Sequence, residues 1–126
     1  MGGYKIKNMI KLTVDEAYAF DYYSILSLKH SNGFISLETL QISKKDLEES
    51  LGKNLVEEIL NSHEYDSLLE ANKLTFDAVD KAKEDLVKAS YVDKCNYERM
   101  LAKKSLQNKF FNTDLSETKI GYERLK

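Results

Sequence analysis

The sequence contains no proline and no tryptophan, and it has only one cysteine and five glycines. One cysteine excludes a disulfide within the chain. The N-terminal stretch MGGYKIKNMIKL lacks the continuous apolar run of a signal peptide, so we expect the cytoplasm. Five scattered glycines supply neither a glycine-rich phosphate loop nor a G-x-S-x-G motif. The missing proline and tryptophan, beside many Lys, Asn and Ile, favour an AT-rich genome of bacterial or phage type.

Long apolar runs are also missing. No window approaches 18 uncharged apolar residues, so a membrane span is not expected. With 126 residues, 42% of them hydrophobic and 32% charged, the chain has the composition of a folded protein. Its length gives room for one domain with a modest core.

Charge is unevenly spread along the chain, although the net charge is only −2. Residues 1–12 carry +3, residues 13–90 carry −8 and residues 91–126 carry +3. Basic ends can indicate contact with nucleic acid. The negative net charge favours a different explanation, in which the basic ends are attracted to the acidic middle of the same molecule or of a partner copy. Nucleic acid is therefore not the expected partner.

The hydrophobic pattern predicts three parts. Residues 1–12 alternate like an extended arm or an edge strand, with lysines on one face. Residues 13–112 read as a single helical domain, and residues 113–126 as a polar tail. The first helix is predicted to begin with a capping box of Thr13 and Glu16 and to end at Asn32-Gly33.

Shorter helical units are predicted to follow. The stretch SLETLQ reads as a helical turn, Ser43 as the cap of a helix closed by Gly52, and Asn54 as the start of another. The heptad pattern of residues 65–111 is too poor for a coiled coil, so we expect two packed helices with a break near residues 89–91, or one gently bent helix. The expected fold is all-α: a small bundle of four to five helices whose long C-terminal pair packs against the first helix.

Asp21 is the first candidate site residue, because it falls within an apolar stripe of the first helix. An unpaired buried carboxylate is very costly, so we expect Asp21 to be buried and paired with a Lys, Arg or Tyr hydroxyl of a neighbouring helix. The alternative is a ligand-binding pocket in which Tyr18, Tyr22 and Tyr23 surround Asp21. Asp21→Ala should lower the melting temperature if the paired arrangement is right.

The stretch YVDKCNYERMLAKKSLQNKFFN, residues 91–112, is the second candidate. On a helical wheel its cations disperse, and Cys95 falls on an apolar stripe, as expected of a small buried hydrophobe rather than a reactive thiol. A second, roughly opposite apolar stripe predicts an interface with a partner. It contains Tyr97, Met100, Leu101 and Phe111.

The residues argue against DNA binding by a helix-turn-helix, against a metal site and against catalysis. The two short helices around Gly52 resemble a helix-turn-helix only superficially, because Glu57 and Glu58 would repel phosphates. Neither His30 nor His63 has a glutamate three residues before it, and Cys95 has no zinc-finger spacing. We therefore expect no metal, no cofactor and no catalytic residue.

The leading hypothesis from the sequence is a non-enzymatic protein-protein interaction or assembly protein that forms a homo-oligomer, most simply a two-fold dimer. A small nucleic-acid-associated regulatory protein using its basic ends is the first alternative. A ligand-binding or enzymatic bundle centred on Asp21 and its neighbouring tyrosines is the second.

Overall fold

The structure, a computed structural model, describes residue 10 and residues 12–111 as five helices joined by short connections. They are α1 (Glu16–Ser31), α2 (Leu37–Leu51), α3 (Lys53–Leu60), α4 (His63–Lys83) and α5 (Ala89–Phe110). Over these residues the chain has no strand, which confirms the predicted all-α bundle. The expected arm falls mainly on residues 1–9 and the expected tail on residues 113–126, and both lie outside the described residues.

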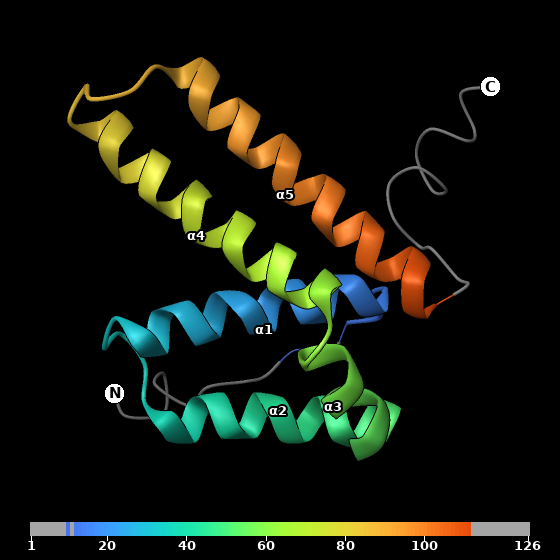
Figure 1. Cartoon of the computed structure of the whole chain (residues 1–126). Helices are drawn as coiled ribbons and strands as arrows, with labels where there is room; N and C mark the ends of the chain where they lie inside the picture. The colour runs from blue at the N-terminus through green and yellow to red at the C-terminus, as the bar shows by residue number, and fades with distance from the viewer. Residues whose placement is uncertain (1–9, 11, 112–126) are drawn as a thin grey trace.

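The long C-terminal helices dominate the arrangement. In Figure 1, α4 and α5 run side by side as an antiparallel hairpin, and α1 crosses one end of it. On the other side of α1 lies α2, and α3 connects α2 back to the start of α4. Because α5 packs on α4 and α1, the predicted contact of the C-terminal pair with the first helix is present.

The predicted end of α1 is right, and its predicted start is two residues too early. Asp15 is the N-cap: its carboxylate accepts a hydrogen bond of 3.0 Å from the Tyr18 N–H, while Thr13 lies outside the helix. A carboxylate serves here as well as a hydroxyl, and it also suits the positive helix end. At the other end Gly33 has φ +79°, and the Phe34 N–H reaches the Lys29 carbonyl in a Schellman motif.

The helix starts predicted after Phe34 are wrong. Residues 37–51 form one helix, α2, capped by Ser36, whose hydroxyl accepts a hydrogen bond of 3.2 Å from the Thr39 N–H. Ser43 lies inside that helix because nothing between the two serines breaks it. Gly52, at φ +89°, ends α2 and serves as the N-cap residue of α3, so Asn54 lies within α3 rather than at its cap.

The break in the long C-terminal pair comes earlier than predicted. Helix α4 ends at Lys83 and α5 begins at Ala89, so the connection spans residues 84–88 instead of 89–91. Asp85 takes a left-handed conformation, φ +59°, which allows the Leu86 N–H to bond the Lys81 carbonyl. Within α4, Lys81 forms an ion pair of 3.0 Å with Asp77, whereas Glu84, Asp85 and Lys88 belong to the connection.

The core lies where the helices converge. Phe20 of α1 meets Tyr65 of α4 edge to face, with ring centroids 6.5 Å apart. Leu106 of α5 is fully buried in the same cluster. The other buried members come from α1, α3 and α4: Ala17, Tyr23, Val56, Ile59 and Leu68. This core rigidly positions the side of α1 and α5 on which the candidate residues lie.

Candidate functional site

Asp21 lies at the junction of three helices. Its side chain is almost fully buried, and the Arg99 guanidinium of α5 donates to both of its oxygens, at 2.8 Å from Nη2 to Oδ2 and 3.4 Å from Nε to Oδ1. Asn72 of α4 donates to Oδ1 as well, at 2.9 Å. Asp21 is therefore buried and paired with a cation of a neighbouring helix, the arrangement expected from the sequence.

Ser24 and Asn72 complete this cluster. The Asn72 amide also donates to the Ser24 hydroxyl at 2.6 Å, and that hydroxyl donates to the Asp21 backbone carbonyl at 2.7 Å. Asn72 Oδ1 is buried and finds no donor in the described part of the chain. One unmet acceptor typically costs about 1–3 kcal/mol. Desolvation also offsets much of the attraction within a buried ion pair, so the cluster adds little net stability, whereas removing one partner would leave the other without compensation.

Gln107 ties α5 to the start of α1, and sequence reasoning missed it. The Ala17 N–H donates to Gln107 Oε1 at 2.8 Å, and Gln107 Nε2 donates to the Glu16 carboxylate at 2.9 Å. A side chain from another helix thus satisfies one of the free N–H groups of the first turn of α1. Nothing local marks a glutamine for this role, because its partners lie 90 residues away in the chain.

Of the four residues of the predicted pocket, Tyr18, Asp21 and Tyr22 lie within one turn of α1, and Tyr23 lies apart from them. Tyr23 is buried on another side of α1, near Ser27 and Lys44, and burial raises its pKa above the ordinary value of 10.0. Tyr18 and Tyr22 are 52% and 57% exposed. The acceptor atoms of Asp21 are already taken by Arg99 and Asn72, so a ligand would have to displace them.

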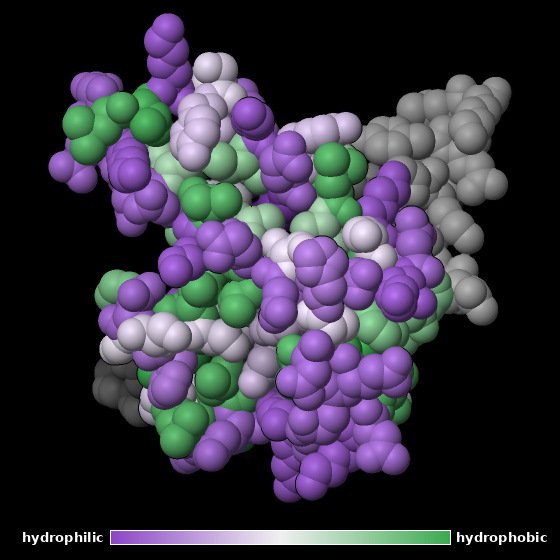
Figure 2. Space-filling model, in the orientation of Figure 1, coloured by the Kyte–Doolittle hydropathy of each residue, from purple (hydrophilic) through white to green (hydrophobic). Residues whose placement is uncertain are grey.

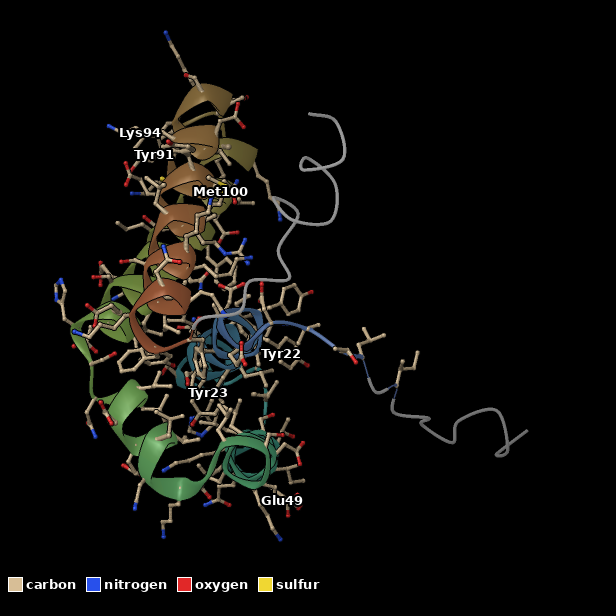
Figure 3. All side chains as sticks on the ribbon, turned by 90° about the vertical axis from the view of Figure 1, so that its right-hand side faces the viewer. Tyr22, Tyr23, Glu49, Tyr91, Lys94 and Met100 are labelled. Atoms are coloured by element: carbon tan, nitrogen blue, oxygen red, sulfur yellow. The ribbon has the colours of Figure 1, made fainter. Side chains whose placement is uncertain are left out.

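Tyr18, one of the exposed tyrosines of α1, lies beside α5. Lys103 holds its ammonium 5.4 Å from the centre of the Tyr18 ring, a cation–π contact across the seam between the two helices. Met100 follows on α5, and Figure 3 shows it on the same side of the molecule as Tyr22. The aromatic side chains of α1 thus continue onto the surface of α5.

Three of the four predicted interface residues share one surface. Tyr97, Met100 and Leu101 recur at the spacing of a single helical face, and Tyr97 and Leu101 are 56% and 39% exposed. Together with their neighbours they define what we call the outer face. Its residues are Tyr18, Tyr22, Tyr97, Met100 and Leu101 with the two lysines Lys103 and Lys104.

Phe111 does not belong to the outer face. It is half-buried and packs against the core cluster. The helix ends at Phe110, and Phe111 has extended backbone angles, φ −137° and ψ 149°. A helical wheel that continues through residue 111 therefore places its side chain on the wrong side.

Cys95 lies on the inner side of α5 and is 7% exposed, as expected of a small buried hydrophobe. The neighbouring Cys95 thiol raises the pKa of Tyr91 above its ordinary value of 10.0. A thiol in this position has a packing role between α4 and α5.

In residues 10 and 12–111, no three His, Cys, Asp or Glu side chains are grouped so that they could hold a metal ion. No helix in this part of the chain has both the length and the apolar character of a membrane span. Compared with known proteins, the chain has no significant match to a family model, a curated protein sequence or a solved structure.

Proposed function

We propose that this chain is a non-enzymatic assembly protein that associates with further copies of itself through the outer face. The observation that carries the proposal is the exposure of three tyrosines, Tyr18, Tyr22 and Tyr97, each more than half exposed on helices that pack together. Tyrosine and methionine are enriched in protein interfaces, and a contiguous apolar patch marks an interaction site.

The composition of the outer face supports this role. Its aromatic rings and Leu101 would supply buried apolar area, while Lys103 and Lys104 border them with charge. The Asp21 cluster beneath it fixes α1 against α5, so the surface is preorganised and loses little conformational entropy on binding. We place this association in the cytoplasm of a bacterium or of a phage-infected cell, which suits a lone buried cysteine.

The test compares two double variants, each of which replaces two exposed apolar side chains with serine. Tyr97→Ser with Leu101→Ser removes exposed apolar side chains from the outer face. Leu74→Ser with Leu86→Ser removes exposed apolar side chains from α4 and the α4–α5 connection. Sedimentation velocity should show that the first variant weakens self-association at least about tenfold, the value of a single good apolar anchor. The second should behave like the wild type. Equal association of all three proteins would overturn the proposal.

One observation favours a second candidate function. Exposed tyrosines beside lysines also suit single-stranded nucleic acid, because bases stack on aromatic rings while cations contact phosphates. Fluorescence anisotropy with a single-stranded oligonucleotide tests it. Binding that weakens steeply with salt and is lost in Tyr18→Ser with Tyr97→Ser would support nucleic acid, and no binding at low salt would exclude it.

A further inference from the structure

The fold places the basic end of α5 and the acidic helix α2 on opposite sides of α1. The last three turns of α5 carry Arg99, Lys103, Lys104 and Lys109 without an acidic residue. In contrast, α2 carries four acidic residues against two lysines. Figure 1 shows α1 lying between these two helices, and α5 packs on α4 and α1 while α2 packs on α1 and α3. Part of the attraction expected between the basic end and the acidic middle is made by the ion pair of Arg99 with Asp21 of α1, while no ion pair of the described residues joins α5 to α2.

The outward side of α2 has the features of a complementary surface. Ile42 is 53% exposed, and Glu38, Asp46 and Glu49 lie four before, four after and seven after it, on the same side of the helix. Lys45 is the one cation among them. Figure 3 shows Glu49 directed away from the body of the molecule, and Figure 2 shows the hydrophilic surface over the end of α2 and α3. We call Glu38, Ile42, Asp46 and Glu49 the acidic face.

From these two surfaces, and on the premise of the proposed function, we infer that the outer face of one copy binds the acidic face of a second copy. The exposed Ile42 would meet the aromatic rings, and the carboxylates around it would meet Lys103 and Lys104. Complementary charge of this kind selects the partner and fixes its register.

A two-fold dimer whose axis passes through either of these faces would join like with like. Two outer faces in contact bring Lys103 and Lys104 of both copies together, and two acidic faces bring their carboxylates together. Like charges placed opposite one another are destabilising. The head-to-tail contact avoids both repulsions. It also leaves one free outer face and one free acidic face at the ends of every pair, so association continues into a ring or a chain of copies.

A mixing experiment distinguishes the two arrangements. One variant has a disabled outer face, Tyr97→Ser with Leu101→Ser, and the other a disabled acidic face, Ile42→Ser with Glu49→Lys. All four residues are exposed, so both variants should fold. Circular dichroism melting checks that they do. Sedimentation velocity is then recorded for each variant alone and for their equimolar mixture.

The inference predicts that each variant alone is monomeric and that the mixture forms a 1:1 dimer and nothing larger, because only one working interface remains. It also predicts that association of the wild type weakens roughly tenfold or more when the salt is raised well above physiological strength. If the variant with the disabled acidic face associates like the wild type, the head-to-tail inference is overturned while the proposed function stands. A wild type that stays monomeric overturns both.

Discussion

The inner and outer sides of α5 differ in what their side chains contact. The inner side presents Cys95, Arg99 and Leu106 to α1 and α4, and each side chain there has a partner in the bundle. The outer side presents Tyr97 and Leu101 to solvent. Both sides carry apolar residues, so the helix shows no clear division into an apolar and a polar face. An apolar side that the bundle does not need is the feature that points to a partner.

Helix α5 thus has two tasks. The inner side should determine whether the chain folds, and the outer side whether folded chains associate. Changes on the inner side are therefore expected to alter the free energy of unfolding, and changes on the outer side to leave it unaltered. The predictions below test that separation.

Leu106→Ala should produce the largest effect. Leu106 is fully buried, so its truncation leaves a cavity and should lower the free energy of unfolding by about 2–5 kcal/mol. Leu101→Ala, five residues earlier on the outer side, is the matched control and should change it by no more than about 0.5 kcal/mol. Urea unfolding followed by circular dichroism measures both. A similar loss of unfolding free energy in the two variants would contradict the distinction between the inner and outer sides of α5.

Asp21→Ala should come next. It leaves Arg99 and Asn72 without their acceptor, and we expect a loss of about 1–3 kcal/mol because the Arg99 side chain, 30% exposed, can turn toward water. Asp77→Ala removes the exposed Asp77–Lys81 pair and should cost less than about 0.5 kcal/mol. An unchanged melting temperature for Asp21→Ala would show that the cluster does not hold the helices.

Alkaline pH should separate buried from exposed tyrosines. Burial raises the pKa of Tyr65 well above the ordinary value of 10.0, so the folded state resists its ionisation. Stability from this group is fully present below pH 10 and should be lost as the pH rises above 10, because the unfolded chain ionises first. Tyr65→Phe should therefore flatten the decline of stability between pH 10 and 12.

The control for that experiment is Tyr97→Phe, which changes an exposed tyrosine of the outer side. Melting temperatures measured across the same pH range should decline in this variant as steeply as in the wild type. If the two substitutions flattened the profile equally, burial of Tyr65 could not be the cause.

Apart from the control variants, Lys103→Gln should have the smallest effect on stability. Its ammonium contacts the Tyr18 ring at the seam between the two sides, and an exposed cation–π contact contributes about 0.5–1 kcal/mol. The substitution removes this contact and one cation of the outer face. Thermal melts should shift by only a few degrees, while self-association should weaken measurably. A large drop in melting temperature without a change in association would show that Lys103 serves folding, as the inner side does, and not association.

Much of this fold follows from local pattern. Asn32-Gly33 ends α1 as predicted, and the burial and pairing of Asp21 follow from a carboxylate within an apolar stripe. The helix starts were harder, because several residues near each start could cap it. Ser36 and Ser43 are chemically equivalent caps, and only the continuity of α2 decides between them.

The candidate site shows the same limit. The stripe of Tyr97, Met100 and Leu101 could be predicted from helical spacing alone. Phe111 could not be placed, because the helix ends just before it. The identities of Arg99, Asn72 and Gln107 as partners were also out of reach, since each contact joins residues about 50 to 90 positions apart. Such contacts depend on how the helices pack, which local spacing does not determine.

The most direct test of the account is sedimentation equilibrium of the wild-type chain at low salt, over concentrations from about 1 to 100 µM, where moderate interfaces dissociate. We predict an average mass that rises with concentration above the 14.5 kDa of one chain. A mass that stays at 14.5 kDa over the whole range would contradict the claim that the outer face joins copies of this protein.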